Sequence, residues 1–206
     1  MILKSFESDL VFRENTYLLI SGSQALLIDP GADPELLIGE ILSGAYNLLA
    51  VLATHGHMDH ILAAKPLCER FGCPFYMHGG DRNWLEELQN MCAHFRLPYY
   101  GTPILNFDLA ESAELDLDPF HFKLLHTPGH SAGSVCFLTG DQLFSGDTLF
   151  RHSVGRSDLP GGDLTLMKRS LREKILSLPG ATRVYPGHLE ATDIAEERKH
   201  NPFVVL

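Results

Sequence analysis

The chain has 206 residues, with 26 acidic and 16 basic side chains and a formal net charge of −10. This acidic balance argues against nucleic acid as a partner, because no cluster of Lys and Arg offsets it. No segment is apolar for long enough to cross a membrane, so no membrane partner is expected. The length predicts one domain with one sizeable core, spanning residues 1–206.

The first half of the chain alternates predicted strands and helices. Apolar runs predict strands at residues 1–6, 16–20, 25–28 and 48–53. Helices are predicted at residues 33–42, 59–71 and 80–95. Asp33 is suited to cap the first helix, with Pro34 at its first helical position, and Asp59 to cap the second.

The second half has the same alternation after a connecting region. Residues 97–119 contain prolines, acids and short apolar runs, which predict a loop with short strands. Further strands are predicted at residues 122–125, 142–144 and 183–185, and helices at 163–178 and 191–199. This order predicts an α+β or α/β fold, with two sheet-and-helix halves that join near residue 120.

Residues 55–60, His-Gly-His-Met-Asp-His, follow directly on the strand predicted at 48–53. Three imidazoles and a carboxylate within six residues are hard to explain as packing, since protonated imidazoles side by side repel each other. Imidazole and carboxylate are ligands that zinc, iron and other divalent ions accept. The stretch therefore predicts a metal site on a turn at the edge of a sheet.

Three more strands end in turns that carry a single ligand-type residue. These residues are His130, Asp147 and His188, in the stretches Thr-Pro-Gly-His, Ser-Gly-Asp-Thr and Tyr-Pro-Gly-His. Taken alone, each is equally typical of an ordinary loop corner. If the four strands lie side by side, their turns meet at one edge. The candidate ligands are then His55, His57, Asp59, His60, His130, Asp147 and His188.

The four cysteines, Cys68, Cys73, Cys92 and Cys136, form no Cys-x-x-Cys pair, so neither a zinc ribbon nor a thioredoxin-type motif is expected. Cys68 and Cys73 flank a predicted helix end and are interpreted as buried or free thiols. The first ten residues contain no stretch typical of a signal peptide. Reduced thiols in the cytoplasm are therefore the expectation.

Five motifs in order resemble the metallo-β-lactamase fold superfamily, in its hydrolase branch. They are Thr-His-Gly-His-Met-Asp-His at 54–60, Thr-Pro-Gly-His-Ser-Ala-Gly-Ser at 127–134, Gly-Asp-Thr-Leu-Phe at 146–150, Pro-Gly-His at 186–188 and the first hairpin around 15–31. Gly-Arg-Ser-Asp-Leu-Pro-Gly-Gly-Asp at 155–163 is similar to small bacterial glyoxalase II-like hydrolases. The resemblance implies a four-layer αβ/βα sandwich with a metal site at one edge of its two sheets.

The resemblance also implies a set of ligands for two divalent metal ions. His55, His57 and His130 would hold one ion, Asp59, His60 and His188 the other, and Asp147 would bridge them. Zinc is the expected metal, and the same ligands accept iron or manganese. Asp59 is also the expected catalytic residue, placed to hold the bridging water and accept its proton.

A glyoxalase II-type site implies hydrolysis of a small-molecule thioester, with S-D-lactoylglutathione as the expected substrate, by a metal-bound hydroxide. Arg156 is carried over as a contact to an anionic thiol portion of the substrate. The other interpretation is a structural ion pair of Arg156 with Asp158 or Asp163. A cysteine replaces the residue matching Asp147 in clinical-type zinc β-lactamases, so antibiotic hydrolysis is not expected as the main role.

Two other functions fit parts of the same pattern. A mononuclear iron persulfide dioxygenase would use His55, His130 and Asp147 as a two-histidine, one-carboxylate triad. A non-enzymatic metal-binding or scaffold protein would need no open coordination position, and seven intact ligands argue against it. Metal content, oxygen uptake and thioester cleavage together distinguish the three.

Overall fold

The computed structural model describes residues 1–9 and 12–204, which form two compact units, Met1–Leu109 and Ala110–Leu206. Each unit contains its own six-stranded mixed sheet. The boundary lies earlier than the predicted junction near residue 120, because strands β7 (Glu114–Leu117) and β8 (Phe120–His126) pair with each other and both belong to the second unit. The single domain expected for residues 1–206 stays a prediction.

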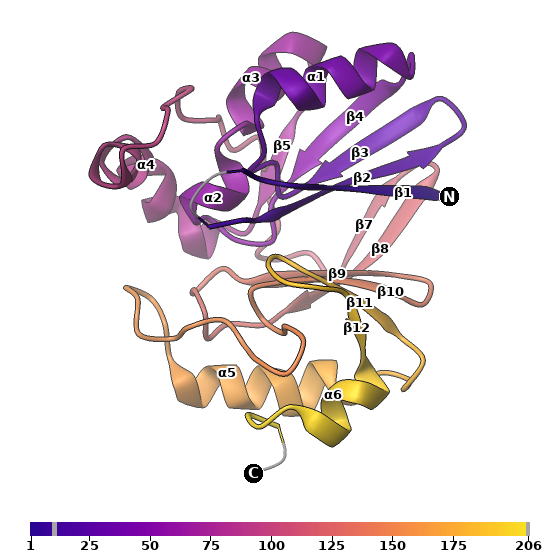
Figure 1. Cartoon of the computed structure of the whole chain (residues 1–206), viewed down its shortest axis with the longest axis vertical. Helices are drawn as coiled ribbons and strands as arrows, with labels where there is room; N and C mark the ends of the chain where they lie inside the picture. The colour runs from indigo at the N-terminus through magenta and orange to yellow at the C-terminus, as the bar shows by residue number, and fades with distance from the viewer. Residues whose placement is uncertain (10–11, 205–206) are drawn as a thin grey trace. The chain divides into compact units, whose positions relative to one another are not determined.

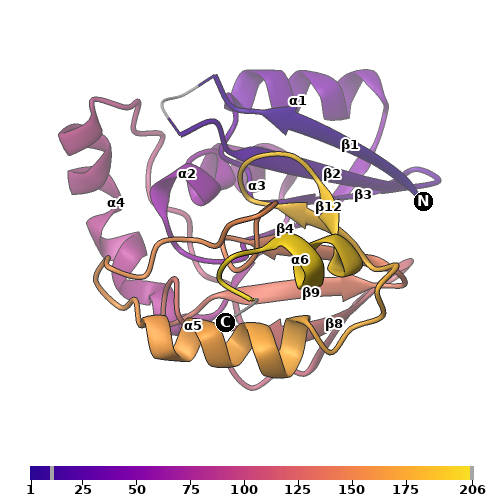
Figure 2. The same ribbon diagram turned by 60° about the horizontal axis from the view of Figure 1, so that its bottom comes forward.

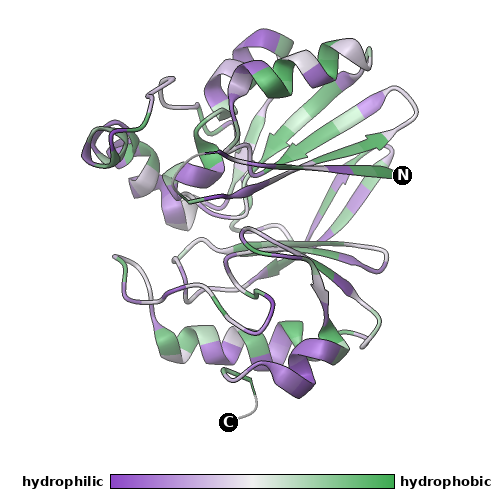
Figure 3. Ribbon diagram, in the orientation of Figure 1, coloured by the Kyte–Doolittle hydropathy of each residue, from purple (hydrophilic) through white to green (hydrophobic). Residues whose placement is uncertain are grey.

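The sheet of the first unit has the strand order β1-β2-β3-β4-β5-β6. The strands are β1 (Ile2–Glu7), β2 (Asn15–Ser21), β3 (Gln24–Ile28), β4 (Asn47–Leu52), β5 (Phe75–Met77) and β6 (Phe107–Asp108). The first three pair antiparallel and the others parallel. Strands β2 to β4 are apolar along most of their length, as central strands covered on both faces are (Figure 3).

Helices of the first unit are α1 (Pro34–Ser43), α2 (Met58–Ile61), α3 (Ala64–Phe71) and α4 (Arg82–Phe95). Helices α1 and α3 lie on one face of the sheet (Figure 1), and α3 packs against β4. The predicted cap of α1 is confirmed, because Asp33 accepts a hydrogen bond from the amide of Glu35 at 2.9 Å.

The single helix predicted at residues 59–71 is wrong, since α2 ends at Ile61 and α3 begins at Ala64. The physical reason is Pro66, which has no amide hydrogen and whose ring would collide with the carbonyl of Leu62 in a continuous helix. In the first turn of α3 that amide is not needed. The capping role suggested for Asp59 is also wrong, because Asp59 is the second residue of α2 and His57 is at the N-cap.

The sheet of the second unit has the order β12-β11-β10-β9-β8-β7. Its remaining strands are β9 (Val135–Thr139), β10 (Gln142–Gly146), β11 (Arg183–Pro186) and β12 (Thr192–Asp193). Strands β10 and β11 are parallel, and the other neighbours are antiparallel. Strand β9 was not among the predicted elements, although its sequence Val-Cys-Phe-Leu-Thr is an apolar run between turn residues.

Helix α5 (Leu164–Ser170) runs into a π-helical turn at Leu171–Ile175, and α6 (Ile194–His200) ends the second unit. Asp163 caps α5, because its Oδ1 accepts hydrogen bonds from the amides of Thr165 and Leu166. The last helix begins later than predicted, because residues 192–193 form β12 and Asp193 supplies its cap. Helices α5 and α6 lie on the same face of their sheet (Figure 2), so each unit is a mixed sheet with helices, which confirms the α/β class.

Among the residues that the structure describes, no helix combines the length and the apolar character needed to span a lipid bilayer.

Candidate metal centre

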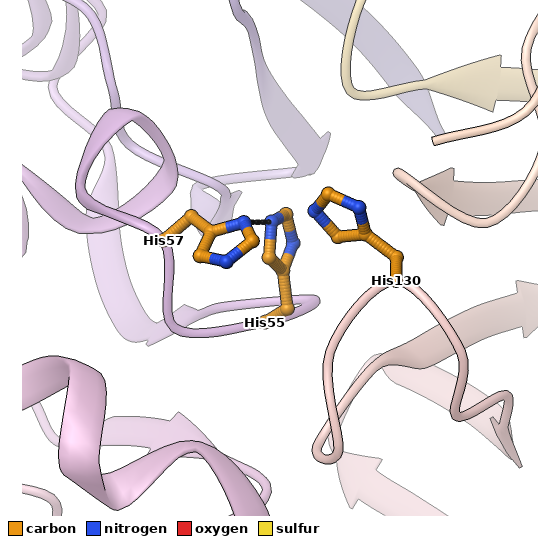
Figure 4. A group of neighbouring side chains, drawn as sticks. All are labelled: His55, His57 and His130. Carbon is orange, nitrogen blue, oxygen red and sulfur yellow. Dashed lines mark hydrogen bonds between the residues drawn. The ribbon is translucent and has the colours of Figure 1, made fainter. Parts of the chain in front are cut away.

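The turn that follows β4 brings the four predicted ligands of the first unit together. His55 and His57 lie on the turn itself, and Asp59 and His60 lie in α2. Nε2 of His55 is 3.0 Å from Nδ1 of His57 (Figure 4), and the ring centroids of His55 and His60 are 4.1 Å apart. The imidazoles are buried although they lie outside a strand or long helix. Buried polar atoms normally have hydrogen-bond partners, so each ring nitrogen in this cluster of imidazoles should have a partner atom.

Asp29 holds two of these imidazoles in place. Its carboxylate accepts hydrogen bonds from the amide of Thr54 at 2.6 Å, the hydroxyl of Thr54 at 2.7 Å and Nδ1 of His60 at 3.0 Å. Because the Thr54 hydroxyl donates to Asp29, its oxygen accepts from Nδ1 of His55 at 3.0 Å. Both rings therefore carry hydrogen on Nδ1 and direct the lone pair of Nε2 elsewhere, as metal-ligating histidines do.

We expect Asp29→Asn to weaken metal binding by roughly 10–100-fold, as changes to outer-shell partners of metal ligands do. The reason is that an amide places an NH₂ group where the carboxylate accepts from Thr54 or His60. Competition against a chromogenic chelator measures the affinity. Asp33→Asn is the matched control, because Asn caps a helix as well as Asp does and Asp33 caps α1. Equal affinities for both variants would contradict the role of Asp29.

Helix α4 and the segment before it support the same turn. Buried Asp81 accepts a hydrogen bond from the amide of Gly56 at 2.9 Å. A side chain at Gly56 would collide with Asp81, with the nearest atom 2.9 Å from its Cβ. The ring of Trp84 packs edge-on against His57, with centroids 4.5 Å apart. Trp84 thus packs directly on a candidate ligand.

Glu14 is a fully buried acid behind the Asp-Pro-Gly turn at residues 29–31. The hydroxyl of Thr16 donates to its Oε2 at 3.1 Å and accepts from the amides of Gly31 and Ala32. Burial raises the pKa of Glu14 well above its usual value; His60 opposes this shift, and Asp29 and Asp59 add to it. Burial therefore favours the neutral carboxyl at this position.

In the second unit, Asp147 faces both predicted histidine ligands. The turn after β10 carries Asp147, and the turns after β8 and β11 carry His130 and His188. One carboxylate oxygen, Oδ2, lies 3.4 Å from Nε2 of His130 and 3.6 Å from Nε2 of His188. The amide of Gly187 donates to the carbonyl of Gly146 at 2.9 Å and aligns two of these turns. A single oxygen within 3.6 Å of both imidazole nitrogens is compatible with a carboxylate shared between two ions.

The turn that carries His130 is held from two sides. Nδ1 of His130 donates to the backbone carbonyl of Arg156 at 2.7 Å, which again leaves the lone pair on Nε2. Gly129 has a φ of 144° and lies so close to α5 that a Cβ would be 2.3 Å from the amide nitrogen of Met167. The hydroxyl of Ser170 donates to the carbonyl of Pro128 at 2.8 Å.

The donor sets of both units fit metal ions. Donor atoms bound to one tetrahedral zinc ion at about 2.0–2.2 Å are about 3.4 Å apart. In the first unit, His55 Nε2 and His57 Nδ1 are 3.0 Å apart, and Asp59 Oδ2 and His60 Nε2 are 3.9 Å apart. In the second unit, Oδ2 of Asp147 lies 3.4 Å from Nε2 of His130 and 3.6 Å from Nε2 of His188. Three of the imidazoles also donate their other nitrogen to an oxygen of the protein. Imidazole and carboxylate donors suit zinc, iron and manganese.

The side chain of Arg156 forms an ion pair with Asp158. Its Nε and Nη2 each donate to one carboxylate oxygen of Asp158 at 2.8 Å. This is one of the two pairs that the sequence left open as the structural interpretation. The hydrogen bonds from Arg156 lower the pKa of Asp158 to about 2. Both side chains remain largely exposed to solvent, so the guanidinium stays accessible to a further anion.

Sequence reasoning did not select Asp29, Thr54, Asp81 or Glu14 as functional residues. A signal existed for Asp29, which follows a buried strand and lies next to a Pro-Gly pair, as His130 and His188 also lie next to one. No comparable signal marked Asp81 or Glu14. Their roles depend on contacts between residues that are distant in the sequence.

Comparison with known proteins shows that the candidate ligands lie within a region that matches a known protein family. Residues 10–188 match the family described as Metallo-beta-lactamase superfamily. The chain is 37% identical over 193 residues to the probable metallo-hydrolase YqgX of Bacillus subtilis, with 92% of each chain covered. It is 35% identical over 198 residues to the hydroxyacylglutathione hydrolase GloC of Haemophilus influenzae, with 94% of this chain and 93% of that protein covered.

Solved structures extend the likeness over the whole chain. The B3 metallo-beta-lactamase BLEG-1 has a TM-score of 0.92 at 37% identity, with all of both chains covered. TTHA1623 in a di-iron-bound form has a TM-score of 0.88 at 39% identity, covering 98% of this chain and 100% of the other. ETHE1 from Myxococcus xanthus has a TM-score of 0.78 at 31% identity, with 98% of this chain and 84% of the other covered.

Proposed function

The chain belongs to the metallo-beta-lactamase superfamily, and we propose that it is a dinuclear metal-dependent hydrolase of a small-molecule thioester, with S-D-lactoylglutathione as its substrate. The similarity to a hydroxyacylglutathione hydrolase over nearly the full length of both chains supports this substrate class. We further propose a cytoplasmic location, in keeping with four free thiols.

The proposed ligand set combines the donors of both units. His55, His57 and His130 hold one ion, Asp59, His60 and His188 hold the second, and Asp147 bridges them. Zinc is the metal that we propose. The di-iron form of a protein 39% identical to this chain supports two ions and makes iron the first alternative.

The observation that carries the dinuclear proposal is the hydrogen bond between Asp29 and His60. A mononuclear site built from His55, His130 and Asp147 does not include His60 as a ligand, so it does not require the His60 ring to be held in one orientation. Yet the same buried carboxylate orients His55, through Thr54, and His60 directly. His60 of the second ligand set is therefore oriented by the same carboxylate as His55 of the first set, which favours two ions.

Different residues of the chain are proposed to have different roles in thioester hydrolysis. When bound, two metal ions supply a polarised carbonyl and an acidified water molecule at neutral pH. The carboxylate of Asp59 is proposed to orient the attacking water and accept its proton. The side chains of His55 and His57 are buried, whereas the carboxylate of Asp59 is partly exposed to solvent. The leaving thiolate is stable near neutral pH, so no acid needs to protonate it.

Arg156 is proposed to contact the anionic thiol portion of the substrate. We expect Arg156→Ala to raise KM for S-D-lactoylglutathione several-fold with a smaller change in kcat, as loss of uniform binding does.

Removing the guanidinium of Arg156 should also return the pKa of Asp158 from about 2 toward 3.8, measurable by NMR titration. Because the folded-state pKa is lowered, the stability that this pair supplies is present above pH 3.8 and lost as the pH falls toward 2.

A thioester that lacks the peptide carboxylates of glutathione separates the two roles of Arg156. Substrate contact predicts a smaller increase in KM for this compound. Equal losses with both thioesters would assign Arg156 to structure alone, through its ion pair with Asp158.

The likeness to ETHE1 favours one alternative function, that of a mononuclear iron persulfide dioxygenase. This enzyme would consume oxygen with glutathione persulfide and need one iron ion per chain. The likeness to a B3 metallo-beta-lactamase also weakens the expectation against antibiotic hydrolysis, because that protein covers the whole chain at 37% identity. A β-lactam is therefore the third substrate to test.

The test combines metal analysis with three activity assays on the same preparation. Protein purified without chelator is expected to contain close to two metal ions per chain and to cleave S-D-lactoylglutathione. An oxygen electrode should show no uptake with glutathione persulfide, and a chromogenic cephalosporin should turn over more slowly than the thioester. One metal ion per chain with rapid oxygen uptake and no thioester cleavage would replace the hydrolase with the dioxygenase.

A further inference from the structure

The loop at residues 150–156, which we call the supporting loop, contacts two candidate ligands of the second unit through its backbone. The amide of Gly155 donates to the carbonyl of Asp147 at 3.1 Å. The carbonyl of Arg156 accepts from Nδ1 of His130 at 2.7 Å. The approach is so close that a Cβ at Gly155 would lie 2.1 Å from the carbonyl oxygen of Asp147 and 2.9 Å from Nδ1 of His130.

The first part of the supporting loop contacts the third candidate ligand of this unit, His188. The ring of Phe150 is buried and packs edge-on against the ring of His188, with centroids 5.8 Å apart. Two backbone hydrogen bonds between Phe150 and Ser153, at 3.0 and 3.3 Å, close this part of the loop into a tight turn. The ring that packs on His188 therefore moves with the turn.

Helix α6 (Figure 1) holds this turn through two buried side chains, those of Glu197 and Asn201. Oε2 of Glu197 accepts hydrogen bonds from the amide of His152 at 2.9 Å and from Nδ2 of Asn201 at 2.8 Å. The same Nδ2 donates to the carbonyl of Ser153 at 2.9 Å. Both side chains are completely buried, so water does not compete for these hydrogen bonds, and their loss would leave buried donors unpaired.

The contacts of Glu197 indicate an acceptor whose length matters. Its other oxygen, Oε1, accepts from the hydroxyl of Thr192 at 2.6 Å, so all three of these donors are uncharged groups. His152, whose amide it accepts, has a φ of 57°, a left-handed conformation that is uncommon for a residue other than glycine. The hydrogen bond to Glu197 holds the loop in this conformation at a fixed distance from α6.

We propose that Glu197 is a positioning residue for the metal centre. It holds the supporting loop by accepting the amide of His152, and the loop in turn holds the candidate ligands His130, Asp147 and His188. The inference rests on the proposed function, because it takes these three residues as metal ligands. It gives a role to a buried acid that takes no part in the proposed hydrolysis.

Two substitutions of Glu197 separate the reach of its side chain from its charge. Glu197→Asp keeps the charge but removes one methylene and withdraws the carboxylate from the amide of His152. Glu197→Gln keeps the length: its carbonyl oxygen can accept from His152 and Asn201, and its NH₂ group can donate to the hydroxyl of Thr192. Ile194→Val is the matched control, because it removes one methylene from a fully buried side chain of the same helix.

The experiment titrates a chromogenic chelator into the zinc-loaded full-length protein and follows hydrogen exchange of the Gly155 amide by NMR. Glu197→Asp should lower the zinc affinity about 10-fold, the lower end of the range for changes to outer-shell partners of metal ligands. Its Gly155 amide, which donates to Asp147, should exchange faster than in wild type. Glu197→Gln and Ile194→Val should keep both the wild-type affinity and the slow exchange.

A second variant reaches the same turn through the other buried side chain. Asn201→Ser is too short to contact both Glu197 and the carbonyl of Ser153, so it should repeat the effect of Glu197→Asp on both measurements. This variant also decides the question if Glu197→Asp does not fold.

Equal losses of affinity in Glu197→Asp and Ile194→Val would overturn the proposal, because Glu197 would then contribute to stability alone. Unchanged affinity and exchange in Glu197→Asp would show that the loop is held without it, and an equal loss in Glu197→Gln would assign the effect to charge. Thioester turnover enters neither measurement. A wild type that binds zinc but cleaves no thioester would refute the proposed substrate and leave this comparison intact.

Discussion

His130→Ala should reduce the proposed thioester hydrolysis by more than the roughly 100-fold upper range seen for outer-shell changes, because it removes a proposed ligand itself. It should also lower the metal content below two ions per chain. The fold should survive, since His130 lies in a turn outside the apolar core cluster of the second unit. Steady-state kinetics, elemental analysis and far-UV circular dichroism on one preparation measure all three effects.

His121→Ala is the matched control for this substitution. His121 is in β8, the strand that leads to the same turn, but its exposed ring pairs with Asp116 at 2.7 Å. Metal content and turnover should stay at wild-type levels. His188→Ala should lower the metal content as His130→Ala does. If either proposed ligand can be removed without loss of metal or activity, the ligand assignment is wrong.

Gly31→Ala should destabilise the first unit by about 3 kcal/mol or more, at the upper end for overpacking a buried site. A Cβ at this position would lie 1.6 Å from the backbone oxygen of Asp59 and 2.4 Å from Oε2 of Glu14. The nearest atom is a backbone oxygen, so the contact cannot be relieved by the rotation of a side chain. The displaced atoms belong to α2, so metal affinity should fall together with the urea midpoint of unfolding.

Gly39→Ala tests whether the effect at Gly31 is steric. Gly39 lies within α1, and a Cβ there would meet nothing within 4 Å. Alanine favours a helix over glycine by up to about 1 kcal/mol, so this variant should be slightly more stable than wild type. Opposite signs for the two substitutions are expected. A mild effect at Gly31 would show that the turn and α2 can separate without cost.

The predicted elements succeeded where periodicity and turn residues agreed. Strands β2 to β4 were recognisable because their apolar runs end at glycine, proline or polar turns. The break between α2 and α3 was readable in the sequence from Pro66, but the helical pattern on both sides obscured it. The π-helical turn at 171–175 had no such signal, since its residues are ordinary helix formers.

The candidate ligands were predictable because they lie on turns after predicted strands and because four of them fall within residues 55–60. Their supporting residues were not. Asp29 acts through Thr54 and His60, and Asp81 acts through Gly56. These contacts link segments far apart along the chain, and only the three-dimensional pairing of strands shows them. The sequence alone therefore predicted candidate donor atoms but not the residues that orient them.

The edges of the two sheets limit association between chains. Edge strands present backbone groups that can pair with another molecule. At β6 and β12 the edge is only two residues long. The longer edge β7 carries Glu114 and Asp116, and β1 carries Lys4 and Glu7. Short length at two edges and charge at the other two make edge-to-edge polymerisation unfavourable, so the protein should tolerate concentrations at which an uncharged edge would seed fibrils.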